Sequence, residues 1–500
     1  MYVCPNATVV AAMNQIMAGG AYSSPQLVEW VIERMWQALL EAPETREMNF
    51  SQVVVFGGKG RTTAVALGLV VRLYELYRLR VKVVLAEGQA ALCPEAASQL
   101  AKLPTGSATE PLVPGPDTLI IDGLLSTGTR GVLKTEYSNK VKELNDLRRR
   151  NPRNIVVSVD MPTGMDPGTG VRGDDVVLAD MTLAVGAARP WMLEDGAEEY
   201  IGALLGVLLP IVPGLGVPIP LSREQVTDAD TVLGWLARRS RSIHKYGAGK
   251  VTVIAGSRGM VGAAQMCAEG ALTAGAGLVT LYCPEDVFAI LATRVAPEVM
   301  VRSLSDITDV RNFVDEASRD EGVLVAGPGV GQTFPMQMLK DVVEAWPRDN
   351  VMVLDAGGLV QAFREHWQIG GNPVFTPHRG ELQKMDPFVI SKGSRKVTVD
   401  NFLRKYKGTL LYKGARTIVS NRAEYYINST GGPWMAGAGQ GDILAGVIGG
   451  LAAQGVPPVR AAALAAYACG LAATDAWRAS GYPPAVRATA LLPYLPGRLA

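Results

Sequence analysis

The chain of 500 residues is 48% apolar and 19% charged, and its formal net charge is +1. This balance excludes intrinsic disorder and gives no electrostatic basis for binding nucleic acid or an anionic membrane. At usual domain sizes the length corresponds to roughly two to four domains. The five cysteines are scattered without a CxxC pair, which argues against a zinc site or disulfide framework and fits a cytoplasmic protein.

The longest uncharged apolar run, residues 201–221, is long enough on paper to cross a bilayer. It contains four prolines that would break a helix repeatedly: Pro210, Pro213, Pro218 and Pro220. We therefore expect the buried end of one domain (residues 1–212), a proline-rich linker (213–224) and a second domain (225–500). The first residues carry no basic segment, so neither a secretory signal nor a membrane span is predicted.

The N-terminal half begins with helical periodicity over residues 25–42. A short apolar strand at 53–56 then leads through glycines 57–60 into a helix at 64–77, and a second strand follows at 81–85. This order is typical of a doubly wound α/β sheet, whose ligands lie at the carboxyl ends of the strands. We interpret the glycine segment as a tight turn with close helix packing, since its motif alone is a weak signal.

Two further strands of this half each end in an acid. Asp122 ends the strand at 118–122, and Asp160 ends the strand at 155–160. The carboxyl ends of buried parallel strands face the same crevice, where catalytic or metal-binding groups are placed. The alternative is that these acids only cap the loops that follow them, which accounts well for one acid and less well for both.

The segment VDMPTGMD, residues 159–166, resembles the VDxPSGxD motif of the NAD(P)H-hydrate epimerase domain. IDGLLSTGTRG resembles that family's DAxFGTG segment, and residues 182–187 match its strand near the domain end. The resemblance implies a Rossmann-like three-layer α/β domain with Asp160 as the acid/base residue. It also implies that Asp122 and Thr163 help to hold a potassium ion. The implied ligand contacts come from the loop at 126–132 and from one tyrosine: Ser126, Thr127, Gly128 and Tyr137.

One departure from that family is large. Where the family carries an NNGGDG loop, this chain reads RTTAVA at residues 61–66. The asparagine that would ligate potassium and the acid that would contact the ligand are absent, and Arg61 adds a cation near the metal position. We expect a domain that keeps its fold and is weak or inactive as an epimerase.

The C-terminal half contains the segment GAGQGDILAG, residues 437–446. Its glycines leave consecutive N–H groups free to wrap an anion, and apolar residues at helical spacing follow directly. The loop therefore opens a helix whose dipole favours negative charge. Asp442, the only acid here, is compatible either with a helix cap or with a general base that activates a hydroxyl for attack on phosphorus.

A second α/β pattern surrounds this segment. The polar residues 222–231 predict the start of a helix that ends near residue 239. Strands are predicted at 250–255, 275–281, 322–326, 351–354, 409–411 and 417–420, with a small-residue helix at 263–274. Four loops at strand ends carry polar groups: AGPGVG at 326–331, Asp355, TPHRGE at 376–381, and Lys413 with the residues after it. Each has an ordinary structural interpretation alone, but together they indicate a site for phosphate and hydroxyl groups.

The order of these segments over residues 240–456 resembles the ADP/ATP-dependent NAD(P)H-hydrate dehydratase domain of the ribokinase-like superfamily. The resemblance implies a ribokinase-like α/β fold and ADP or ATP with Mg²⁺ as cofactors. Implied contacts to hydrated NADH or NADPH fall on Ala264, Gly329, His378 and Asp442. Implied contacts to the adenine nucleotide fall on Lys413, Gly414, Ala415, Arg416, Thr417, Gly439 and Gly441.

Two departures bear on rate and nucleotide preference. Gln440 stands where the family has threonine, and Gly357 stands where the family has an acid. We expect nucleotide-dependent repair of hydrated NADH or NADPH, with Asp442 as the base and ADP favoured by the fused layout. The alternatives are a kinase of the same superfamily that acts on a stable alcohol and a non-catalytic nucleotide-binding scaffold. Apolar surface helices suggest a homo-oligomer.

Overall fold

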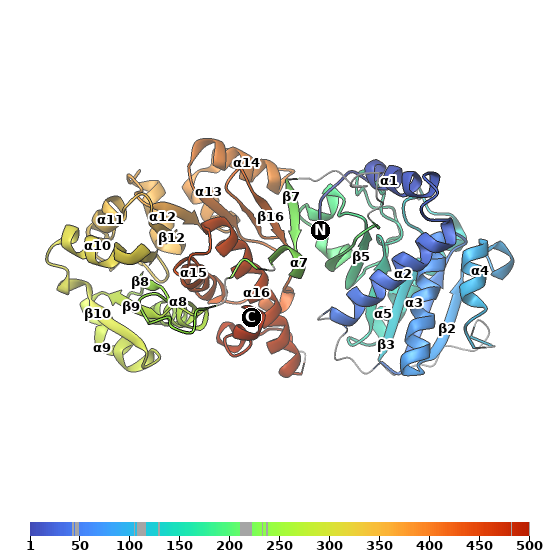
Figure 1. Cartoon of the computed structure of the whole chain (residues 1–500), viewed down its shortest axis with the longest axis horizontal. Coiled ribbons are helices and arrows are strands. Elements are labelled where there is room, and N and C mark those ends of the chain that lie inside the picture. The colour runs from blue at the N-terminus through green and yellow to red at the C-terminus, as the bar shows by residue number, and fades with distance from the viewer. Residues whose placement is uncertain are drawn as a thin grey trace. The chain divides into compact units, whose positions relative to one another are not determined.

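A computed structural model of the chain describes residues 1–42, 45, 50–104, 106–107, 117–128, 131–210, 223–232, 234–236, 239–481 and 483–499. The chain divides into two compact units, Met1–Val226 and Thr227–Ala500 (Figure 1). The predicted linker lies almost entirely outside the described residues, so its bounds stay a prediction. Among the described residues, no helix is long and apolar enough to cross a membrane.

The first unit contains a six-stranded parallel sheet in the order β2-β1-β3-β4-β5-β6. Its strands are nearly continuous apolar runs, as expected for a parallel sheet covered on both faces. They are β1 (Gln52–Gly57), β2 (Arg80–Leu85), β3 (Thr118–Gly123), β4 (Ile155–Val159), β5 (Met181–Val185) and β6 (Ala203–Val207).

Helices cover both faces of this sheet (Figure 1). On one face α2 (Ser24–Glu41) and α3 (Arg61–Tyr77) form a buried cluster with alternate residues of the strands. On the other face α5 (Thr135–Arg150) packs against the remaining strand residues. The predicted three-layer α/β domain is confirmed. The other helices of the unit are α1 (Asn6–Ala18), α4 (Pro94–Leu100) and α6 (Glu198–Ile201).

The second unit contains a sheet in the order β10-β9-β8-β11-β12-β13-β14-β15-β16, and a tenth strand, β7, which spans the boundary between the units, follows β16. The strands from β10 to β14 are parallel, whereas β15 is antiparallel to β14 and to β16. The strands are β7 (Glu224–Thr227), β8 (Lys250–Ile254), β9 (Leu278–Cys283), β10 (Val299–Ser303), β11 (Val323–Ala326), β12 (Val351–Leu354), β13 (Asn372–Phe375), β14 (Thr409–Tyr412), β15 (Ile418–Ser420) and β16 (Tyr425–Asn428).

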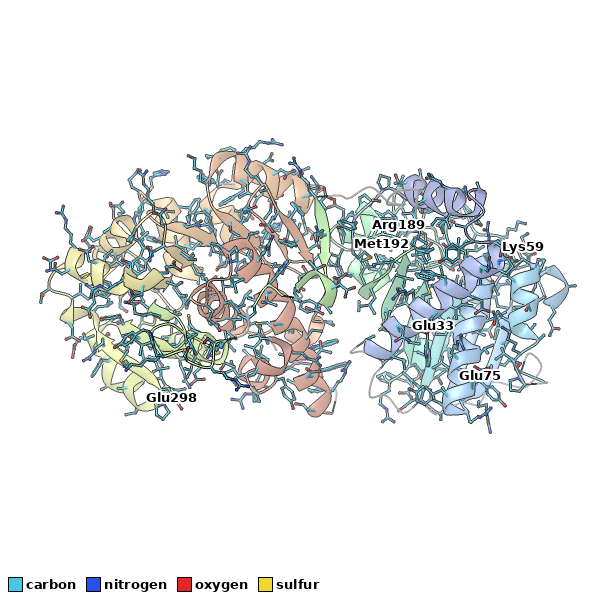
Figure 2. The ribbon with its side chains drawn as sticks, viewed as in Figure 1. Glu33, Lys59, Glu75, Arg189, Met192 and Glu298 are labelled. Carbon is cyan, nitrogen blue, oxygen red and sulfur yellow. The ribbon has the colours of Figure 1, made fainter. Side chains whose placement is uncertain are left out.

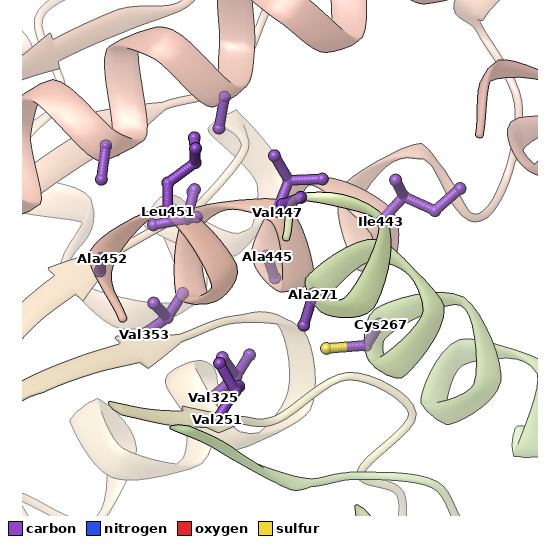
Figure 3. Packing of buried hydrophobic residues seen from close by; sticks show 14 of the residues in the cluster. Val251, Cys267, Ala271, Val325, Val353, Ile443, Ala445, Val447, Leu451 and Ala452 are labelled. Atoms are coloured by element: carbon purple, nitrogen blue, oxygen red, sulfur yellow. The ribbon is translucent and has the colours of Figure 1, made fainter. Parts of the chain in front are cut away.

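Two helices of this unit approach each other so closely that glycine is required at the contact. A Cβ atom on Gly446 would overlap the carbonyl oxygen of Cys267, and one on Gly450 would meet that of Ala271. Val447 and Leu451 pack in the same core (Figure 3). The contact joins α8 (Val261–Thr273) to α15 (Gln440–Ala452). The remaining helices are α7 (Ala229–Val232), α9 (Glu285–Arg294), α10 (Val310–Ser318), α11 (Met336–Ala345), α12 (Ala356–Arg364), α13 (Arg379–Met385), α14 (Arg395–Lys405), α16 (Pro458–Ala479) and α17 (Pro496–Leu499).

The predicted helix that starts in the polar segment at 222–231 is wrong over most of its length. Residues 224–227 form strand β7, and of the described residues between 223 and 239 only Ala229–Val232 are helical. Val226 and Thr227 are 1% and 2% exposed. Burial of these two β-branched side chains in a sheet outweighs the weak helical preference of their polar neighbours.

Candidate active site

Asp442 lies in the first turn of α15, and its helix cap is the preceding glycine loop. Gly439 is the N-cap, with a φ of 95° that favours glycine. The carboxylate of Asp442 accepts no hydrogen bond from any described residue. Burial, reinforced by the nearby Asp355 and Glu381, raises the pKa of Asp442 to about 7, although Lys413 opposes the shift. The structure therefore does not support a capping role for Asp442.

Lys413 occupies the centre of the acidic group beside Asp442. Its Nζ lies 2.8 Å from Oδ1 of Asp355 and 3.5 Å from Oε2 of Glu381. Burial alone would lower the pKa of Lys413, but the two carboxylates outweigh it and raise the pKa. Asp355 also accepts a 2.7 Å hydrogen bond from Oγ1 of Thr376. A Cβ atom on Gly441 would lie 3.4 Å from Nζ of Lys413, so the glycine loop adjoins this ammonium group.

His378 is the N-cap of α13 and forms a reciprocal pair with Glu381. Its Nδ1 accepts a 3.1 Å hydrogen bond from the backbone N–H of Glu381. Its own backbone N–H donates at 2.8 Å to Oε2 of Glu381. When the ring is neutral, Nε2 consequently carries the proton and is available to a ligand. An isolated β-bridge between His378 and Lys413 holds these two predicted loops side by side.

Gly329 and Ala264 lie together on the side of α8. A Cβ atom on Gly329 would lie 2.6 Å from the carbonyl oxygen of Met260, and its φ is 65°. Oγ of Ser257 donates a 2.7 Å hydrogen bond to the carbonyl of Gly329. Ala264 is fully buried, and a Cβ atom on Gly256 would lie 3.0 Å from Cβ of Ala264. The part of the predicted substrate site around Gly329 and Ala264 is thus formed by closely packed backbone.

The predicted nucleotide loop, residues 413–417, folds into a turn in which Oγ1 of Thr417 donates a 2.9 Å hydrogen bond to the carbonyl of Gly414. Ala415 is exposed, whereas Arg416 is buried. Arg395 is a functional candidate that the sequence did not reveal. Its Nη2 donates to the carbonyls of Tyr412, at 2.9 Å, and Lys413, at 3.2 Å. No local motif marks Arg395, because it reaches the turn from α14.

Gly357 is needed for close approach between α12 and the loop after β11. A Cβ atom at this position would overlap the carbonyl oxygen of Val330. The side chain that the family carries here therefore has no room with this backbone. A cavity of about 690 Å³ lies alongside, between the loop after β11, α12 and the start of α13. His378 and Glu381 line it, so the cavity adjoins the charged cluster.

In the first unit, Asp160 is held by a buried arginine. Nη2 of Arg189 lies 2.7 Å from Oδ1 of Asp160, and Arg189 is fully buried. The same carboxylate accepts hydrogen bonds from the backbone N–H of Val185, at 3.0 Å, and from the hydroxyl of Ser126. Arg189, which Figure 2 labels, also donates to the carbonyl of Ala187 at 2.8 Å. Each oxygen of the predicted acid/base group is thus already engaged.

Asp122 and Thr163 are together, as the potassium prediction requires, but they bind each other. Asp122 accepts from the backbone N–H and hydroxyl of Thr163, at 2.9 and 2.8 Å, and from Oγ of Ser158 at 3.0 Å. Burial raises the pKa of Asp122, although these hydrogen bonds act to lower it. Arg61 lies against Sδ of Met17 and makes no contact with either residue in the described structure. These donors offer no open oxygen cage that fits potassium.

Tyr137 is buried against the first glycine turn. Its hydroxyl donates a 2.7 Å hydrogen bond to Glu87, and Nζ of Lys59, a residue that Figure 2 labels, lies 3.6 Å from the same carboxylate. Burial and Glu87 raise the pKa of Tyr137. A Cβ atom on Gly58 would lie 3.0 Å from the tyrosine ring. Thr127 and Gly128 lie on the adjoining loop, whose residues 129–130 are outside the described structure.

Comparison with known proteins assigns both units. The sequence model of the NAD(P)H-hydrate dehydratase family matches residues 251–496, and that of the YjeF-related protein N-terminus matches residues 24–191. A solved ribokinase-like superfamily protein of Enterococcus faecalis superposes with a TM-score of 0.51 at 27% identity. The superposition covers 56% of this chain and 97% of the Enterococcus protein. The chain is a ribokinase-like α/β enzyme fused to a Rossmann-like domain.

Curated relatives extend over both units together. The bifunctional NAD(P)H-hydrate repair enzyme of Coxiella burnetii is 32% identical over 484 residues, which are 92% of this chain and 93% of that enzyme. The corresponding enzyme of Moorella thermoacetica is 32% identical over 397 residues, 76% of this chain and 72% of that enzyme. The chain belongs to the family of bifunctional NAD(P)H-hydrate repair enzymes.

Proposed function

We propose that the C-terminal unit dehydrates the S form of hydrated NADH or NADPH in a reaction that consumes ADP or ATP, with Asp442 as the general base. One observation carries this proposal: a partly buried carboxylate without a hydrogen bond, with a pKa of about 7, stands at the mouth of a glycine loop beside a buried lysine. A base that changes protonation near neutral pH is suited to accept a hydroxyl proton.

The chemistry follows from these groups. Asp442 accepts the proton of the ring hydroxyl at C6, and the hydroxyl oxygen attacks the terminal phosphoryl group of the nucleotide. Backbone N–H groups of residues 437–441 and the ammonium of Lys413 stabilise the charge on the transferring group. The lone pair of the ring nitrogen then breaks the C6–O bond and expels phosphate, and the resulting iminium loses a proton from C5 to the departing phosphate or to water, which forms the C5=C6 double bond. The products are NADH or NADPH, phosphate, and AMP from ADP or ADP from ATP. Phosphorylation thus converts hydroxide, a poor leaving group, into phosphate.

Magnesium fits this site as a companion of the nucleotide. Mg²⁺ is usually bound by substrate phosphates, waters and one or two carboxylates. The described residues contain no group of three or more metal ligands, which agrees with an ion that arrives with phosphate. Asp355 and Glu381 are the carboxylates that would hold it, and the ion would offset negative charge on the phosphoryl oxygens.

Purified chain, hydrated NADH, Mg²⁺ and either ADP or ATP provide the test. Dihydronicotinamide absorbance and free phosphate should appear together, and ADP should give the faster reaction. Asp442→Asn should retain the fold and lose activity by about 10²- to 10⁴-fold. Near-wild-type turnover in that variant would refute Asp442 as base. A stable phosphorylated product from another alcohol, with no dihydronicotinamide formed, would instead favour the kinase alternative.

We infer further that the N-terminal unit is weak or inactive as an epimerase. Asp160 is engaged by Arg189, Ser126 and the backbone of Val185, which opposes a role as a mobile proton carrier. Residues 61–66, which form the first turns of α3, also lack the family's asparagine and acid. With the R form of hydrated NADH as sole substrate, the chain should form NADH only at the slow rate at which the R form converts spontaneously to the S form. Rapid conversion, abolished by Asp160→Asn, would overturn this inference.

A further inference from the structure

The cavity beside the charged cluster continues well beyond the reacting groups. At its near end, Glu381 lies 3.5 Å from Nζ of Lys413 and also lines the cavity. Its wall follows one face of α12, where Gly357, Val360, Gln361 and Arg364 recur at helical spacing. Arg364 lies eight positions after Ala356 on α12, which corresponds to a rise of about 12 Å along the helix axis. A ligand that reacts at Asp442 can therefore extend along this face.

The charged residues that line the cavity are unequally satisfied. Glu365 accepts hydrogen bonds from Gln361 and, at 3.1 Å, from Trp367. Glu381 is engaged by His378 and Lys413. In contrast, Arg364 on α12 and Lys384 on α13 have no hydrogen-bond or ion-pair partner in the part of the chain that the structure describes. The two acids that line the cavity, Glu365 and Glu381, are already engaged by protein groups, whereas the two cations can still bind a ligand. This difference favours an anionic ligand.

We propose that Arg364 and Lys384 bind a phosphate group of the distal half of the dinucleotide substrate. This inference rests on the proposed function, which places the hydrated ring at Asp442. The cavity volume of about 690 Å³ lies in the range of sites for cofactor-sized ligands. The phosphate is either the pyrophosphate, which both substrates carry, or the 2′-phosphate, which only hydrated NADPH carries.

Steady-state kinetics of the full chain separate these sources. Arg364→Gln and Lys384→Gln should each raise the KM of the dinucleotide on the order of tenfold, because a charge-assisted contact is lost. The kcat and the KM of the adenine nucleotide should stay unchanged, since the contact is made equally in ground and transition states. An increase for both hydrated NADH and hydrated NADPH assigns the pyrophosphate, and an increase for hydrated NADPH alone assigns the 2′-phosphate.

Arg348→Gln is the matched control, because Arg348 is exposed and precedes β12, at the opposite strand end from the cavity. An unchanged dinucleotide KM in both cavity variants, or a raised KM of the adenine nucleotide instead, overturns the inference. Binding of NADPH and NADH, followed by dihydronicotinamide fluorescence, tests the same contacts without turnover. If the wild-type chain binds them in an Arg364-dependent manner but does not dehydrate the hydrates, the proposed function fails and the phosphate site stands.

Discussion

The ammonium group of Lys413 lies 2.8 Å from Oδ1 of Asp355, and their side chains are 18% and 2% exposed. The pair forms because Asp355 follows β12 and Lys413 follows β14, and only β13 separates these strands in the sheet. The same two residues act in opposite directions on the pKa of Asp442: Asp355 raises it and Lys413 lowers it. The pair therefore acts on the pKa of Asp442, the proposed base, and also joins the ends of β12 and β14.

Replacing Lys413 with methionine should leave Asp355 as an unpaired buried charge. Loss of one partner of a buried pair typically costs about 3 to 5 kcal/mol. Lys413→Met combined with Asp355→Asn should recover much of this loss. Urea unfolding of the wild type, both single variants and the double variant measures the coupling, and simple additivity would contradict it.

The pH dependence of the reaction should report Asp442. As a base it acts only when ionised, so kcat/KM should rise with pH and level off above about 7, the pKa that burial imposes. Rates measured between about pH 5 and pH 9 would locate the inflection. A profile that is flat across this range would show that another group accepts the proton.

Asp442 should also carry a stability cost that depends on pH. Its folded-state pKa of about 7 exceeds the ordinary value of 3.8, so the folded protein retains the proton as the unfolded chain releases it. Wild-type stability should consequently fall as pH rises from about 4 to about 7. Asp442→Asn should be more stable by about 1 to 3 kcal/mol at slightly alkaline pH, allowing for partial exposure, and indistinguishable below about pH 4. Equal stability at both values would contradict the shift.

Gly357→Ala should destabilise the second unit, because the new Cβ overlaps the carbonyl of Val330. Overpacking of this kind costs about 1 to 3 kcal/mol. Gly262→Ala is the control: it adds the same methyl group near the start of α8, where no atom lies within 4 Å. Thermal unfolding should separate the two, and equal midpoints would show that the loop after β11 yields freely.

Arg395→Gln should weaken nucleotide binding indirectly, because Arg395 supports the predicted nucleotide turn and is not expected to contact the nucleotide itself. Arg395 holds the carbonyls of Tyr412 and Lys413, and its guanidinium lies 4.3 Å from the Tyr412 ring centre. Loss of these contacts should raise the nucleotide KM by about tenfold and leave the pH inflection in place. Partial rescue by Arg395→Lys would separate positioning from general packing, whereas a changed inflection would point to an effect on Asp442.

The sequence located the parts of the site that depend on local pattern. The glycine loop before α15, the acid at the end of β12 and the turn after β14 lie where periodicity placed them. Contacts made by side chains across the fold left no such signal. Arg189 pairs with Asp160 only because β5 lies beside β4 in the sheet, and no local sequence pattern near either residue predicts this ion pair. Likewise, the overlap that excludes a side chain at Gly357 depends on a loop 27 positions away.

The glycine contact between α8 and α15 has a mechanical consequence. Ala264 belongs to one helix and Asp442 to the other, and their backbones touch at Gly446 and Gly450 with no side chain between them. Because backbone meets backbone at this contact, a side-chain rotamer change cannot alter the separation of the two helices. Any change in the spacing between Ala264 and Asp442 therefore requires the backbone itself to move.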